Sequence, residues 1–115
     1  MPDRVWGGGA NVPTKHFRVN ASWPFAKLTL EGDRVVLHVR IVHRFGAQTL
    51  IATPEDLVSV WPISRGGGVG FRLLDGREFY FWTIRGRDIL DWLWSRGFPV
   101  TTESGPAAKV WRGVP

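Results

Sequence analysis

The sequence predicts a mainly β domain of six to seven antiparallel strands followed by one C-terminal α-helix over about residues 87–96. Short runs of alternating apolar and polar residues recur through residues 25–84, as strands with one buried face require. Turn-forming residues at 31–33 and 75–76 separate several of these runs. After residue 86 the apolar spacing changes to that of an amphipathic helix. No strand–helix–strand alternation indicates a parallel sheet.

The first two predicted core strands form a hairpin. Residues 25–31 alternate, with Leu28 and Leu30 on one face, and residues 34–42 alternate in the same way. The Glu-Gly-Asp turn at residues 31–33 is short enough to join them directly. The two runs therefore read as an antiparallel pair with one apolar face.

Four further strands complete the predicted sheet. They cover residues 48–52, 57–63, 69–74 and 77–84. The pair at 75–76, Asp-Gly, is the strongest hairpin signal in the chain. Phe71, Phe79 and Phe81 alternate on these strands, so we expect them to point into the core.

The predicted helix has a clear apolar face and a clear stop. Its apolar face is formed by Ile89, Leu90, Leu93 and Trp94. Trp92 lies beside this face, where we expect it to be half-buried. Gly97 is predicted to adopt a left-handed conformation that ends the helix, with Phe98 packing back on the last turn.

The chain is long enough for one domain, and three parts are predicted. Residues 1–20 read as a weakly structured lead-in, because glycines at 7–9 and a proline at 13 interrupt any regular element. A short edge strand within residues 16–20 is the one exception. Residues 21–100 form the domain, and residues 101–115 are a polar tail.

Two segments carry a resemblance to a known family. These are NASWPFAKL at residues 20–28 and FWTIR at residues 81–85, followed by the helix and GFPV at residues 97–100. Together they resemble a group of small bacterial proteins that have pleckstrin-homology-like (PH-like) domains of unassigned function. The resemblance implies a partly open barrel of two bent sheets, with the helix closing one end. Phosphoinositide-binding PH domains carry Lys and Arg in their first hairpin, whereas the turn here is net acidic, so the resemblance implies the fold without that ligand.

Residues of the catalytic and metal-binding types do not form a recognisable site. The chain has no cysteine, which excludes disulfides, zinc–thiolate sites and cysteine nucleophiles. The three histidines, His16, His38 and His43, have no acidic neighbours that would complete a metal site. The acids lie in turns or on the polar face of the helix. We therefore expect no metal, no cofactor, no small-molecule substrate and no enzymatic activity.

The charge balance indicates an anionic partner. The net charge is +5, and 12 of the 15 basic residues are Arg. The densest basic region, with a second contribution from the glycine-rich connector, gives a candidate anion-binding or partner-binding patch: Arg40, His43, Arg44 and Arg65. The alternative is that these are ordinary solvated charges, because the basic residues are scattered along the chain.

Three of the seven tryptophans lie outside the strongest periodic elements: Trp6, Trp23 and Trp111. If they are exposed, they are candidate contacts with another chain, because exposed tryptophan is favoured at interfaces. The alternative is that Trp23 and Trp111 close the ends of the barrel.

These observations favour a non-catalytic PH-like module that binds another protein or a second copy of itself, with an anionic membrane surface as a subsidiary partner. The alternative is a basic nucleic-acid-binding domain that uses Arg40, Arg44, Arg65, Arg72 and Arg77. The chain shows neither a signal peptide nor an apolar run that could span a bilayer, so we expect a cytoplasmic protein.

Overall fold

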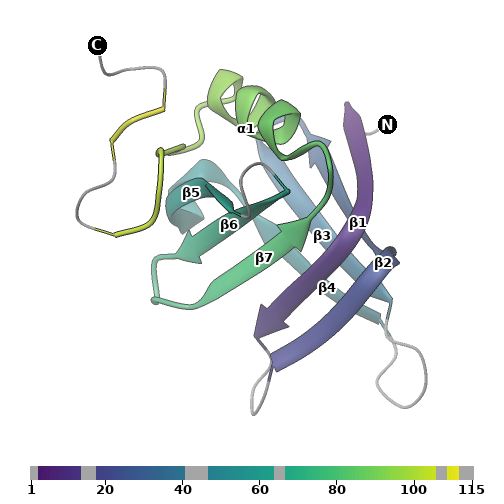
Figure 1. Cartoon of the computed structure of the whole chain (residues 1–115). Coiled ribbons are helices and arrows are strands. Elements are labelled where there is room, and N and C mark those ends of the chain that lie inside the picture. Colours follow the sequence, from purple (N-terminus) through teal and green to yellow (C-terminus); the bar gives the residue numbers. More distant parts are fainter. Residues whose placement is uncertain (1–2, 14–17, 41–46, 64–66, 106–108, 112–115) are drawn as a thin grey trace.

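A computed structural model of the chain describes residues 3–13, 18–40, 47–63, 67–105 and 109–111. Within these residues the chain forms one seven-stranded antiparallel sheet and one α-helix (Figure 1). The strands are β1 (Arg4–Pro13), β2 (Arg18–Glu31), β3 (Arg34–Arg40), β4 (Ala47–Ala52), β5 (Leu57–Ile63), β6 (Gly68–Leu73) and β7 (Glu78–Trp82). The helices are the short 3₁₀ helix η1 (Pro54–Asp56) and α1 (Gly86–Ser95).

The strand order in the sheet is β4-β3-β2-β1-β7-β6-β5. Successive strands pair within β1–β4 and within β5–β7, and the pairing of β1 with β7 joins these two halves. The sheet is strongly curled, and α1 lies across one end of it (Figure 1). The predicted mainly β fold with one C-terminal helix is confirmed. The helix itself is one residue earlier at each end than the sequence predicted.

The inward faces of the strands form one core. Phe71, Phe79 and Phe81 are all buried there as predicted, and the Phe71 and Phe79 rings stack with centroids 4.5 Å apart. The alternating apolar residues of β2 and β3 supply the opposite wall: Leu28, Leu30, Val35, Leu37 and Val39. The predicted strands therefore have the faces that their alternation indicated.

The apolar face of α1 is narrower than predicted. Ile89, Leu90 and Leu93 are buried against the sheet, but Trp94 is 37% exposed. Gly86 is also buried, so the buried residues form one narrow stripe along the helix. Trp94 lies at the margin of this stripe. The assignment of Trp94 to the buried face was therefore wrong, whereas Trp92 is partly buried as expected.

The predicted end of the helix is confirmed. Gly97 adopts a φ of 83°. Its N–H donates to the Trp94 carbonyl at 3.2 Å, and the Phe98 N–H donates to the Leu93 carbonyl at 3.1 Å. These two bonds make a Schellman motif, and Phe98 is buried against the core.

The predicted weakly structured lead-in is instead a central strand. β1 occupies residues 4–13 and pairs with both β2 and β7. A β-carbon on Gly8 would lie 2.0 Å from the Trp82 carbonyl oxygen, so the glycine allows β7 to approach β1 closely. The short strand predicted within residues 16–20 is present from Arg18 onwards as the start of β2, where β1 is its one pairing partner among the described strands, because β3 pairs only with residues 26–31.

The C-terminal segment also belongs to the domain. The Val60 N–H on β5 donates to the Pro99 carbonyl at 2.9 Å, and the Thr101 N–H donates back to the Val60 carbonyl at 2.7 Å. The Trp111 N–H then donates to the Val100 carbonyl at 2.8 Å. Residues 99–101 therefore cover the outer edge of β5, and the predicted boundary at residue 100 was too early. No helix in the described ranges is long and apolar enough to cross a membrane.

Candidate binding surface

A hollow on the described surface lies on the outer face of β1 and β7. It has a volume of about 650 Å³ and is called the apolar hollow below. Its lining residues are Gly7, Gly9, Ala21, Gly67, Trp82, Thr83 and Ile84. None of these residues carries a formal charge, so the hollow offers apolar contact rather than chemistry.

The hollow exists because β1 places residues without side chains on its outer face. Strand alternation points Trp6 and Gly8 inward and leaves Gly7 on the outer face, and the buried Gly9 also lines the hollow. Gly9 lies directly opposite Trp82 in the pairing of β1 with β7. The floor of the hollow is therefore strand backbone.

The hollow continues along the N-terminal half of β1. The two strands pair only through residues 9–11 of β1 and residues 80–82 of β7, because the chain then leaves the sheet towards α1. A second hollow of about 580 Å³ follows, and it shares Gly7, Thr83 and Ile84 with the first. Val5 also lines it.

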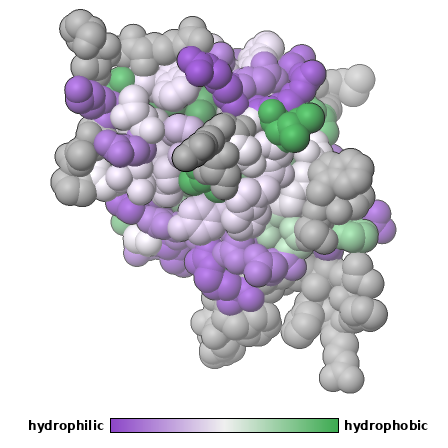
Figure 2. Space-filling view, viewed as in Figure 1, coloured by the Kyte–Doolittle hydropathy of each residue, from purple (hydrophilic) through white to green (hydrophobic). Residues whose placement is uncertain are grey.

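Large apolar side chains surround these hollows without being covered. Val5 is 50% exposed, Trp82 is 37% exposed and Ile84 is 97% exposed. Figure 2 shows this face as a pale band of intermediate hydropathy with a few hydrophobic residues, bordered above and below by hydrophilic ones. An apolar, concave strip with a polar rim is the usual anatomy of a protein-binding surface.

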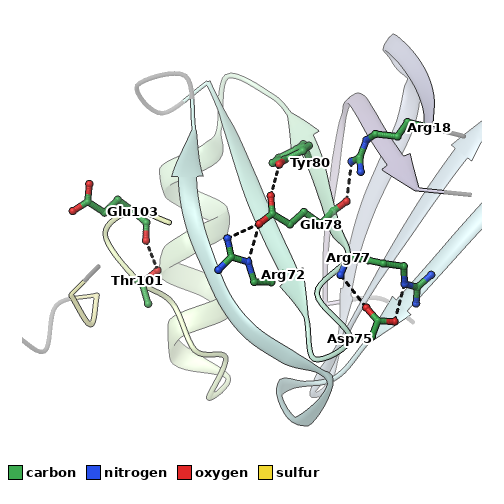
Figure 3. A network of polar contacts seen from close by, with 8 residues as sticks. All are labelled: Arg18, Arg72, Asp75, Arg77, Glu78, Tyr80, Thr101 and Glu103. Atoms are coloured by element: carbon green, nitrogen blue, oxygen red, sulfur yellow. Dashed lines mark hydrogen bonds and ion pairs between the residues drawn. The ribbon is translucent and has the colours of Figure 1, made fainter. Parts of the chain in front are cut away.

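The outer face of β6 and β7 carries a polar network next to the hollow (Figure 3). Arg72 Nε donates to Glu78 Oε2 at 2.7 Å, and the Tyr80 hydroxyl donates to Glu78 Oε1 at 2.5 Å. Arg18 Nη2 donates to the Glu78 carbonyl at 2.8 Å. The bond from Tyr80 and the pairing with Arg72 lower the pKa of Glu78, and the same bond raises the pKa of Tyr80.

This network leaves little free positive charge on β6 and β7. Arg72 pairs with Glu78, and Arg77 pairs with Asp75 at 2.8 Å. The Arg77 backbone N–H, and after it the Arg77 guanidinium, lower the pKa of the Asp75 carboxyl. Trp61 lies over Gly70, and the Arg72 guanidinium stacks on Trp61 at 5.6 Å. Arg72 and Arg77 are therefore both paired with acids within the domain.

The predicted basic patch is described only in part. Arg40 ends β3 and is exposed, whereas His43, Arg44 and Arg65 lie outside the described residues. Arg40 borders another hollow of about 400 Å³, called the basic hollow below. Its lining residues are Phe25, Ala26, Lys27, His38 and Arg40.

Lys27 and His38 were not among the predicted site residues. The sequence contained a signal for them, because both lie on the polar faces of the predicted first hairpin. The register of that hairpin places Lys27 directly opposite His38. His38 Nδ1 lies 3.1 Å from Thr49 Oγ1 on β4, which holds the imidazole ring by one nitrogen.

Trp6 is buried and cannot serve as an interface contact, which corrects the prediction. It is 4% exposed, and its Nε1 donates to Asp88 Oδ2 on α1 at 3.0 Å. Arg4 Nη2 approaches the same oxygen at 3.1 Å. These two donors lower the pKa of Asp88, with the bond from Trp6 as the larger cause. Trp6 therefore ties β1 to the helix.

Trp111 is also buried, so its prediction as an interface contact is corrected in the same way. Its Nε1 donates to Asp91 Oδ1 at 3.3 Å, and the Arg87 guanidinium lies 5.8 Å from its ring centroid. The alternative that Trp111 closes one end of the domain fits this position. Trp23 belongs to β2, and its side chain lies outside the described residues.

The acid-side pH dependence of stability follows from these carboxylates. The pKa of Asp88 is below its ordinary value of 3.8 in the folded chain, and Asp3 shifts in the same direction through Arg96 and the Gly32 N–H. A lowered folded pKa contributes stability that is present above the ordinary pKa and is lost as the pH falls through the folded pKa. We expect the urea midpoint of unfolding to fall steadily as the pH is lowered below about 4.

Asp88→Asn is the matched variant for this measurement. It should unfold at lower urea than the wild type at neutral pH, and its midpoint should depend less on pH. An unchanged pH dependence in this variant would show that Asp88 has the same pKa in both states.

Comparison with known proteins adds no identification, because no protein-family model and no curated protein matches the chain. In the parts of the chain that the structure describes, no group of His, Asp or Glu residues could hold a metal ion. The candidate site therefore consists of the apolar hollow and the basic hollow on the outer face of the sheet.

Proposed function

We propose that this protein is a non-catalytic, PH-like binding module that holds a segment of another protein in the apolar hollow. The proposal is supported by the strongly curled single sheet with α1 across one end, since the resemblance implies a partly open barrel that a helix closes at one end. The hollow itself supplies the site. The proposal needs no cofactor, because the lining residues offer only apolar contact and backbone.

One observation carries this proposal: three exposed apolar side chains lie around a hollow whose floor is strand backbone. They are Val5, Trp82 and Ile84. A soluble chain gains nothing from leaving three large apolar side chains together in water, whereas a partner that covers them removes their apolar surface from water. Burying an isoleucine side chain alone contributes roughly 1.5–3 kcal/mol. The hollow also accepts a side chain of the partner, and buried anchors of that kind dominate binding at protein interfaces.

Filling the hollow at Gly7 is the direct test. A β-carbon on Gly7 would have no heavy atom within 4 Å, so Gly7→Leu places a side chain in the hollow without disturbing the core. We expect immobilised Gly7→Leu and Trp82→Ala to lose the protein that the wild type captures from a cell lysate. Val58→Ser, which changes a 48% exposed valine on β5, should capture it normally. Equal capture by all four proteins would contradict the proposal.

The nucleic-acid alternative has weaker support. Three of the five arginines that this alternative uses lie in the described ranges. Arg72 and Arg77 are paired with acids, and only Arg40 has no acidic partner there. Nucleic-acid binding depends on phosphate neutralisation by free cations and is strongest at low salt. Absence of DNA and RNA binding at low salt would remove this alternative.

A further inference from the structure

The basic hollow is a second feature of the same outer face. Lys27 on β2 and His38 on β3 are directly opposite each other, and Arg40 follows His38 by two residues on the same face. Phe25, which is 39% exposed, forms part of the lining. Two neighbouring strands therefore present two cations and an imidazole around one depression.

The cations of the basic hollow have no acidic partner in the described structure. Five of the eight other described arginines form ion pairs with acids: Arg4, Arg34, Arg72, Arg77 and Arg96. No acid lines the basic hollow, and neither Lys27 nor Arg40 pairs with one among the described residues. Positive charges that lie close together on a sheet repel each other, so a bound anion stabilises this arrangement.

The two hollows lie next to each other on the sheet. Gly7, in the floor of the apolar hollow, is the direct pairing partner of Lys27, which in turn pairs with His38. Neighbouring strands lie about 4.8 Å apart, so about 10 Å separates Gly7 from His38. Alternate side chains of an extended chain point to the same side and lie about 6.8 Å apart, so an acidic residue two positions from the apolar one lies between Lys27 and His38.

We infer that the partner segment is acidic: an extended peptide whose apolar side chain enters the apolar hollow and whose Asp or Glu side chain, two positions away on the same face, binds among Lys27, His38 and Arg40. This inference rests on the proposed function. The net charge of +5 favours an acidic partner and opposes a second copy of this chain. Two neighbouring depressions, one apolar and one basic, suit the alternate side chains of an extended peptide.

Selection from a random peptide library on the immobilised protein tests the inference. We expect the peptides that bind the wild type to combine an aromatic or aliphatic residue with Asp or Glu two positions away. Lys27→Glu should weaken a selected acidic peptide about tenfold in calorimetry, because it places like charges together. Lys109→Glu is the matched control, since it makes the same change at another exposed lysine and should bind the peptide like the wild type.

The outcomes separate this inference from the proposed function. The selected peptides could show no acidic preference and bind Lys27→Glu normally, yet fail to bind Gly7→Leu. That result would overturn the inference and leave the proposed function intact. Peptides that bind Gly7→Leu as well as the wild type would overturn both. The selection could also yield no acidic peptide, while the wild type co-sediments with phosphatidylserine vesicles and Lys27→Glu does not. That result would overturn the inference in favour of a membrane surface.

Discussion

Gly8→Ala is expected to lower the free energy of unfolding by about 3 kcal/mol or more, at the upper end of the effects of overpacking. The new β-carbon would lie 2.0 Å from the Trp82 carbonyl oxygen and 2.9 Å from the Phe81 ring. The carbonyl belongs to the backbone of β7, so it cannot move without disturbing the pairing of Gly9 with Trp82. That pairing joins the two halves of the sheet, which is why a single methyl group has so large an effect.

Gly7→Ala is the matched control for this experiment. The same methyl group one residue earlier points to the outer face and has no heavy atom within 4 Å. An alanine there restricts the unfolded chain, so stability should stay unchanged or rise by up to about 1 kcal/mol. Urea unfolding followed by circular dichroism measures both variants. Equal effects at Gly7 and Gly8 would contradict the placement of β1 against β7.

The glycine run also shows where sequence reasoning about the fold reached its limit. The hairpin turns, the inward phenylalanines and the glycine cap of α1 depend on residues close together in the chain, and they were predicted correctly. The role of Gly8 depends on Trp82, which lies far along the chain. A run of glycines on its own predicts a break in structure, whereas a strand that approaches it closely requires those same glycines.

The candidate site was predicted less well than the fold, for a related reason. The apolar hollow is defined by missing side chains at Gly7 and Gly9, and no local pattern indicates a depression. The two misassigned tryptophans are buried because carboxylates on α1 accept their indole N–H groups, and Trp6 lies 82 residues from its acceptor. By contrast, Lys27 and His38 could have been found, because the predicted hairpin already fixed their faces.

Trp111→Ala is the second variant for which we expect a large effect, a loss of about 3 kcal/mol of stability. Trp111 is 9% exposed and packs on the core. The variant leaves a cavity and removes the bond to Asp91 and the stacking of Arg87. The sequence placed this residue in a polar tail, as a contact with another chain or as a residue that closes one end of the barrel, and its burial favours the second.

Val110→Ala is the control, because Val110 is the neighbouring residue and is 50% exposed. Its urea midpoint should match the wild type within error, whereas Trp111→Ala should unfold at clearly lower urea.

Trp111 also holds the segment that covers β5, through its N–H bond to the Val100 carbonyl. Loosening this segment uncovers a strand edge, and uncovered edges pair with other chains. Trp111→Ala should therefore elute earlier in size-exclusion chromatography as its concentration rises, and a monomeric variant of undiminished stability would show that the C-terminal segment is not part of the fold.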